Sequence, residues 1–407
     1  MRKPDHLRSR ARLKTSTNKS MKPITYIAKA VLSIGLLFAA PVMLVTNITG
    51  AQPPSVPAVQ AAAQQRFASL KAHARLDTTW REARDRAVSR VINPDDYECG
   101  PTDFDTWING KFAAVQDFNA FINILNLGAL DWATFYSLAF DNNASDDYIG
   151  VSGRQTPEMK KRLKDLQGFW DVPTQDVQLQ GMHGADLADD AKMIPVVQFL
   201  YGYDAVTAAA VVHYVQYVIK NDPGLGFNNP LFTLNAFAFS ASTEPPGSPF
   251  LGIPDKIVMG EGIIEAFADM GLGVNGPDMV IAHEFGHHVQ FELGVFNVVV
   301  PNEDLPEFTR RTELMADAFG AYYCAHSRGA AFQAKRVIDT FRSSYLVGDC
   351  AFDNPGHHGT PNQRQATAEW AANLAASASN QGHINSSSLM LSLFDHQLPI
   401  LVAPDAP

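Results

Sequence analysis

The segment 275–293 constrains the fold more than any other part of this sequence, because it combines the signals of a buried helix with charged side chains. It opens with Asn-Gly-Pro-Asp, which is typical of a helix start, and Gly294 is suited to end the helix. His283, Glu284 and His287 would therefore face a core, where polar groups without partners cost several kcal/mol. Apolar residues surround them on the same segment: Met279, Val280, Ile281, Val289 and Leu293.

These three polar residues form the pattern His-Glu-x-x-His. On a helix, His283 and His287 lie one turn apart on the same face, so both imidazoles can reach one metal ion. Glu284 lies beside that face, where its carboxylate can take a proton from a metal-bound water. The alternative is an ordinary helix whose two core histidines are satisfied by hydrogen bonds.

A hydrolytic metal site of this type needs a third protein ligand and an open position for water. The metzincin pattern is excluded, because Gln290 and Leu293 stand where it requires glycine and histidine. A second helix is predicted over about 306–329, and on it Glu313 and Asp317 lie four residues apart on one face. Glu313 can bind the metal, while Asp317 can accept the ring N–H of a ligand histidine.

Two alternatives stay open for this second segment. Glu313 and Asp317 could form a solvated acidic face that pairs with Arg310 and Arg311, although their neighbours are mostly small or apolar. The third ligand could also come from the end of the first helix or from the loop after it, where four acidic residues stand: Glu292, Glu303, Asp304 and Glu307.

The motif His-Glu-x-Gly-His-His, followed about 25 residues later by Glu-Leu-x-Ala-Asp, resembles the gluzincin peptidases, and more narrowly the bacterial neutral zinc metallopeptidase family. That family also carries His-Gly-Thr-x-x-Gln-Arg, which residues 358–364 match. Residues 234–237 and 256–264 are similar to the stress-response and CAAX-processing gluzincins of membranes. The resemblance covers roughly residues 230–370 and is most specific at the metal motif.

This resemblance implies an α+β, mostly helical fold, with a zincin-like catalytic domain and a small sheet beside the metal helix. It implies Zn²⁺ as the cofactor, held by His283, His287 and Glu313, with Asp317 behind them. A second electrophile commonly assists the oxyanion in such enzymes. His358 is the first candidate, and His357 and Tyr322 are weaker ones; the alternative for the two histidines is a turn between helices.

The first 51 residues predict a targeting segment. An apolar run from 30 to 45 follows Lys22 and Lys29 and precedes small residues suited to cleavage, which indicates a signal peptide and an exported protein, periplasmic or secreted. Without cleavage the segment would be a single-span membrane anchor.

The first 51 residues carry nine Lys/Arg and one Asp, and subtracting this net charge of +8 from the −10 of the whole chain leaves −18 for residues 52–407. So acidic a remainder is poorly suited to nucleic acid.

The rest of the chain divides into a helical accessory or pro-region over 52–175, a zinc peptidase domain over 176–375 and a C-terminal tail over 376–407. Helices are expected over 64–91, within 112–140 and over 191–219, and strands over 232–237 and 256–259. His213 is expected in the core, and His183 is ambiguous. Of three cysteines, Cys324 and Cys350 are the nearer pair in sequence, but their pairing stays open.

Together these features predict an exported zinc-dependent endopeptidase that acts on a peptide or protein substrate. Two other classes remain. One is a catalytically inactive, metal-bearing binding protein, against which the intact Glu284 argues. The other is a helical interaction module without metal.

Overall fold

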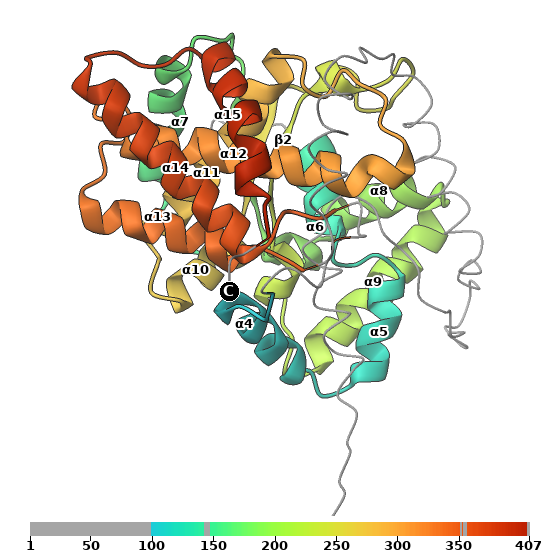
Figure 1. Ribbon diagram of the computed structural model, residues 1–407. Helices are drawn as coiled ribbons and strands as arrows, with labels where there is room; N and C mark the ends of the chain where they lie inside the picture. The colour runs from blue at the N-terminus through green and yellow to red at the C-terminus, as the bar shows by residue number, and fades with distance from the viewer. Residues whose placement is uncertain (1–98, 142–146, 351, 353–355, 405–407) are drawn as a thin grey trace, which may run out of the picture.

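The computed structural model describes residues 99–141, 147–350, 352 and 356–404. The predicted targeting segment over 1–51 and the predicted helix over 64–91 therefore lie outside the described residues. Within them the protein is mostly helical with one small mixed sheet, which confirms the expected α+β class (Figure 1).

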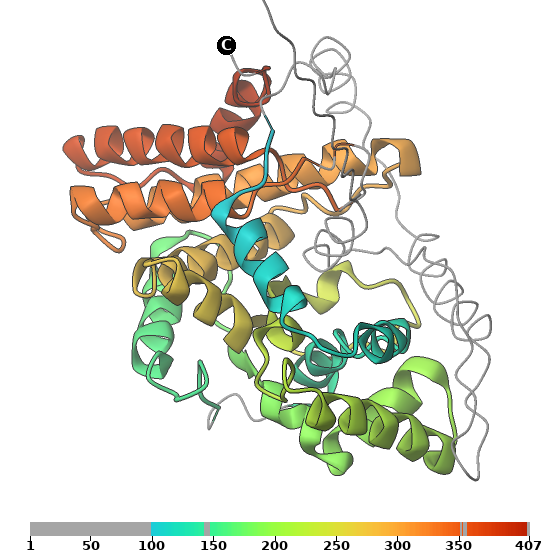
Figure 2. The same ribbon diagram turned by 90° about the horizontal axis from the view of Figure 1, so that it is seen from below.

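The helices are α4 (Asp103–Ala113), α5 (Phe118–Asn126), α6 (Trp132–Phe135), α7 (Thr156–Phe169), α8 (Asp190–Tyr201), α9 (Ala205–Asn221), α10 (Glu261–Asp269), α11 (Asn275–Glu292), α12 (Leu305–Ala325), α13 (Ala334–Leu346), α14 (Pro361–Asn380) and α15 (Ser387–Leu401). The strands are β1 (Gln178–Met182), β2 (Ala236–Phe239) and β3 (Lys256–Gly260). Figure 2 shows the C-terminal helices at one end of the molecule and α8 and α9 at the other, with α4 between them.

The sheet has the order β1-β3-β2, with β1 parallel and β2 antiparallel to the fully buried β3. The strand expected over 256–259 is confirmed. The one expected over 232–237 begins only at Ala236, because Pro230–Thr233 forms a 3-10 turn in which the Asn229 side chain accepts a hydrogen bond from the N–H of Leu231. β1 was not predicted, since the polar and apolar alternation of Gln-Leu-Gln stops at Gly181 and is too short to indicate a strand.

The two helices that carry the candidate ligands, α11 and α12, pack closely at two glycines. A side-chain carbon on Gly286 would lie 3.0 Å from the Cα of Ala316, and one on Gly320 would lie 3.0 Å from the backbone nitrogen of His283. The small residues Ala316 and Gly320 on α12 thus allow the close approach of α11. α14 packs along the other side of α12.

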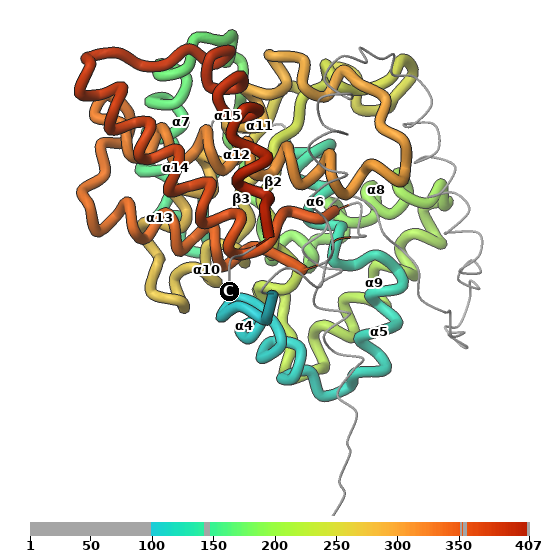
Figure 3. The backbone as a smooth tube through the Cα atoms, in the orientation of Figure 1, coloured from blue at the N-terminus to red at the C-terminus, as the bar shows by residue number. Residues whose placement is uncertain are grey.

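One hydrophobic core includes buried side chains from Phe104 in α4 to Val402 after α15. The segment expected to be a tail over 376–407 contains the end of α14 and the whole of α15. α15 lies against α12 (Figure 3). The Asp395 carboxylate on α15 accepts two hydrogen bonds of 2.9 Å from Arg311 of α12. These contacts correct the expectation of a tail, because they fix this segment on the helix that carries Glu313.

A further expectation needs correction. His213 is not in the core: its side chain is 58% exposed on α9, and Nε2 lies 2.9 Å from an oxygen of Asp190. The cysteine pairing that the sequence left open is settled in the structure: the disulfide joins Cys99 to Cys350, whose Cα atoms are 5.8 Å apart, and Cys324 is free and buried on α12.

His183 forms a buried hydrogen-bonded bridge at the carboxyl end of β1. Its Nδ1 lies 2.8 Å from Oε1 of Glu261, at the start of α10, and its Nε2 lies 3.0 Å from Oδ1 of Asp147. Tyr148 stacks on the ring. Burial alone would lower the pKa of His183, but the two carboxylates raise it to about 9. The bridge therefore holds three segments together through a charged imidazole.

The helices before the sheet are tied to those after it. Arg162 of α7 donates a hydrogen bond of 3.0 Å to buried Asp278 of α11, and Trp107 of α4 donates one of 2.8 Å to Asp269 of α10.

Among the described helices none is by itself long and apolar enough to cross a membrane; α8 and α9 meet the length and composition criteria only as a pair bent by 116°.

Candidate metal centre

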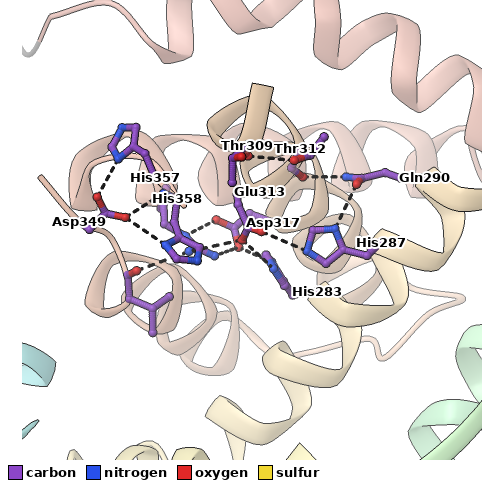
Figure 4. Close-up of polar contacts among 12 residues, drawn as sticks. His283, His287, Gln290, Thr309, Thr312, Glu313, Asp317, Asp349, His357 and His358 are labelled. Carbon is purple, nitrogen blue, oxygen red and sulfur yellow. Dashed lines mark hydrogen bonds and ion pairs between the residues drawn. The ribbon is translucent and has the colours of Figure 1, made fainter. Parts of the chain in front are cut away.

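Two histidines from α11 and one glutamate from α12 meet in a compact cluster (Figure 4). Nε2 of His283 lies 3.3 Å from Oε2 of Glu313, and Nε2 of His287 lies 3.4 Å from Oε1 of the same carboxylate. All three donor atoms lie within 4.8 Å of one another. The structure thus brings together the three residues predicted as ligands, and they could hold a metal ion.

The other ring nitrogen of each histidine has an acceptor. Nδ1 of His283 donates to Oδ1 of Asp317 at 2.9 Å, which is the contact predicted for Asp317. Nδ1 of His287 lies 3.1 Å from Oε1 of Gln290, whose amide nitrogen donates to the carbonyl of Thr312 at 2.7 Å. With both protons held on Nδ1, the lone pairs of both Nε2 atoms face the cluster and are available for a metal.

Asp317 is in turn held by Arg364 of α14. The guanidinium donates to both carboxylate oxygens, at 2.7 Å from Nε and 2.8 Å from Nη2, and both side chains are buried. A two-pronged contact of this kind fixes the plane of the carboxylate. Arg364 therefore orients His283 through Asp317.

The charges of the cluster favour a cation. Burial alone would lower the pKa of His283, yet Asp317 and Glu313 raise it to about 10. Burial alone would raise the pKa of Glu313, but the charges of His287 and then of His358 lower it well below its usual value. The carboxylates thus stay ionised and stabilise positive charge between them, which a bound metal ion would supply.

Glu284 lies between the two histidines of the cluster on α11 and is buried. Burial raises the pKa of its carboxyl group, while the positive charges of His283 and His287 oppose the rise. A carboxylate with a raised pKa is a better proton acceptor near neutral pH than an exposed one. Its position next to His283 is the one that the sequence pattern predicts.

His358 is the candidate electrophile that lies closest to the cluster. In Figure 4 its ring stands between Asp349 and Glu313, and Nδ1 lies 3.0 Å from Oδ2 of Asp349. His357 is fully buried, with Nδ1 2.7 Å from the other oxygen of Asp349. Tyr322 lies in the core, where its hydroxyl accepts a hydrogen bond from the backbone N–H of Asn385. The geometry therefore separates His358 from the two weaker candidates.

The rival third ligands do not belong to the cluster. Glu292 is exposed at the end of α11, Glu303 is exposed in the loop before α12, and Glu307 pairs with Arg310. Asp304, half-buried, is the N-cap residue of α12 and is not part of the cluster. The solvated acidic face is also excluded, because Asp317 is buried.

Three residues of this site had no role predicted from the sequence: Gln290, Asp349 and Arg364. Arg364 could have been found, since it ends the His-Gly-Thr-x-x-Gln-Arg element. Gln290 follows His287 by three residues, which places the two on one helical face. Asp349 gives no local signal.

Comparisons with family models, with curated proteins and with solved structures found no match for this chain. The resemblance to zinc metallopeptidases therefore rests on the residues of the cluster itself.

Proposed function

We propose that this protein is a zinc-dependent endopeptidase with a zincin-like catalytic site. The observation that carries the proposal is the spacing of the donor atoms. Tetrahedral zinc with ligand distances of about 2.0–2.1 Å separates its ligand atoms by about 3.3 Å. Nε2 of His283 lies 3.3 Å from Oε2 of Glu313 and Nε2 of His287 lies 3.4 Å from Oε1, each close to this separation, and the three donor atoms all lie within 4.8 Å of one another.

Zinc at this place would acidify a bound water and polarise a peptide carbonyl. Glu284 accepts the proton of the attacking water and passes it to the leaving amine. His358, with its Nδ1 engaged by Asp349, directs Nε2 toward the oxyanion. Asp317 and Arg364 hold His283 in orientation, and Gln290 does the same for His287.

An extended peptide can bind at the free edge of the sheet. Within the part of the chain that the structure describes, β2 is an edge strand paired only with β3, and it packs beside α11, which carries both histidines. A peptide that adds to this edge as a further strand would pass the metal cluster with its backbone held by hydrogen bonds. This mode favours cleavage within a chain over removal of a terminal residue.

Export is part of the proposal. The disulfide between Cys99 and Cys350 supports an oxidising compartment, in agreement with the targeting segment predicted over 1–51.

The test measures metal content and peptide cleavage together for the purified chain and for Glu284→Gln. We expect about one zinc in both proteins and a loss of about 10²–10⁴-fold in turnover for the variant, because the amide cannot accept a proton. Glu292→Gln, on the exposed end of the same helix, is the matched control and should keep full activity. Zinc without activity in the unchanged protein would favour the metal-bearing binding protein, and absence of zinc would favour the interaction module.

A further inference from the structure

Asp349 is the polar centre of the segment that carries His358. Its carboxylate accepts three hydrogen bonds: one from Nδ1 of His357 at 2.7 Å, one from Nδ1 of His358 at 3.0 Å and one from the backbone N–H of His358 at 2.8 Å. The backbone N–H of Asp349 donates to the carbonyl of Gly359 at 2.9 Å. The rotation of the His358 ring therefore depends on where Asp349 lies.

The chain just before Asp349 is anchored by packing. Thr102, the residue that caps α4, donates its hydroxyl to the carbonyl of Leu346 at 2.8 Å. Gly348 lies so close to α14 that a side-chain carbon on it would stand 2.4 Å from the nitrogen of Pro361. Neither contact depends on the redox state of a cysteine.

The residue just after Asp349 is anchored by a covalent bond. Cys350 is joined to Cys99, three residues before Thr102. α4 is itself fixed to α10, through Trp107 on Asp269 and through Lys111, whose Nζ lies 2.9 Å from Glu265. The disulfide thus ties Asp349 to a part of the fold that contains none of the proposed zinc ligands.

We propose that Asp349 is a positioning residue for His358 and that the Cys99–Cys350 disulfide holds it in place, so that reduction lowers turnover while the zinc stays bound. The inference rests on the proposed peptidase function. The three ligands and their partners lie on α11, α12 and α14, and the disulfide joins none of these helices. Breaking it therefore acts on His358 rather than on the metal.

The redox step is an ordinary thiol–disulfide exchange with a dithiol. One thiolate of the dithiol attacks a sulfur of the Cys99–Cys350 bond, which releases one cysteine and forms a mixed disulfide with the other. The second thiol of the reagent then attacks the mixed disulfide and releases the second cysteine. Two electrons and two protons pass to the protein, which leaves two cysteine thiols, and the dithiol becomes a disulfide. In a reducing cytoplasm the chain would remain in its slow form, and oxidation after export would complete the active one.

The test compares the full chain with the double variant Cys99→Ser/Cys350→Ser, with Cys324→Ser as the control for loss of a cysteine outside the bridge. For the double variant we expect a fall in kcat of about 10-fold or more, bounded by the 10²–10³-fold typical for loss of an oxyanion donor, with KM and zinc content close to those of the parent. If the double variant folds poorly, Asp349→Asn tests the same point with the disulfide intact, and we expect it to show the same fall in kcat with KM and zinc content unchanged.

A double-mutant cycle separates positioning from general stabilisation. His358→Ala should cost much less in kcat when added to the serine double variant than when added to the parent. Equal losses in the two backgrounds would overturn the proposal. The ¹⁵N shifts of the His358 ring, assigned with His358→Ala, give a readout that needs no activity: we expect the Nδ1 shift of an N–H hydrogen-bonded to Asp349 in the oxidised protein and that of a more weakly hydrogen-bonded Nδ1 in the variant. Unchanged shifts would also overturn it, whereas absence of zinc or of activity in the parent would count against the peptidase function alone.

Discussion

Replacing Asp317 with Asn should weaken metal binding and destabilise the fold at once, although Asp317 is not one of the proposed ligands. Its carboxylate faces His283 on one side and the two-pronged guanidinium of Arg364 on the other. The amide is nearly the same size and can still accept one hydrogen bond, but its NH₂ group meets a donor. One buried positive charge is then left without its partner.

The magnitudes follow from burial. Breaking a buried ion pair by removing one partner costs about 3–5 kcal/mol, and both Asp317 and Arg364 are less than 5% exposed. Loss of the carboxylate behind a ligand histidine lowers metal affinity by about 10–100-fold, or about 1.4–2.8 kcal/mol. Because a metal that binds only the folded state adds to its stability, the free-energy gap between parent and variant should be larger with zinc than with a chelator.

Urea unfolding in the presence of chelator gives the first quantity, and zinc competition with a chromophoric chelator gives the second. Asp395→Asn is the matched control, because Asp395 accepts the same two-pronged contact from Arg311 but is 37% exposed. It should cost about 1 kcal/mol or less and leave zinc affinity unchanged. If Asp317→Asn changed zinc affinity no more than this control does, the assignment of Asp317 to the metal site would be wrong.

Three further outcomes are expected. Glu313→Ala should lose tightly held zinc in a metal assay, whereas Glu303→Gln, at an exposed rival position, should retain it. His183→Gln should remove a stabilising contribution on the order of 3 kcal/mol that is fully present below about pH 6.5 and is lost as the pH rises through about 9. The free energy of unfolding should therefore change less between pH 6 and pH 10 in the variant than in the parent. Cleavage within 173–184, where the predicted accessory or pro-region meets the predicted peptidase domain, should release zinc or precipitate the protein without raising activity, because β1 pairs there with the central strand. A rise in activity would instead support a latent precursor.

The two ligand helices were predictable because their signals are local. The proline in the first turn and the spacing of His283 and His287 place α11 within one residue of its observed start and end. Glu313 and Asp317 were predictable for the same reason, since a four-residue spacing on a helix of small residues puts both on one face toward a neighbour. Such patterns need only the geometry of a single helix.

Contacts between distant segments were not predictable in this way. Cys99 and Cys350 are separated by 251 residues, and nothing near either one marks it as the partner of the other. His213 has apolar neighbours and was placed in the core, yet α9 turns that position to solvent, where Asp190 of α8 binds it. In both cases the deciding contact comes from an element that the local sequence does not specify.

The cluster itself combines both kinds of information. The separation of the two histidines is set within α11, but their distance from Glu313 is set by how closely α12 approaches. That approach is limited by Gly286 and Gly320, where even one added carbon would stand 3.0 Å from the facing backbone. A methyl group at either position would have to move the helices apart by a few tenths of an ångström or more, and would change the distances between Glu313 and the two histidines. The residue types of the candidate metal site thus follow from two local motifs, whereas the distances between its side chains depend on Gly286 and Gly320, where the two helices meet.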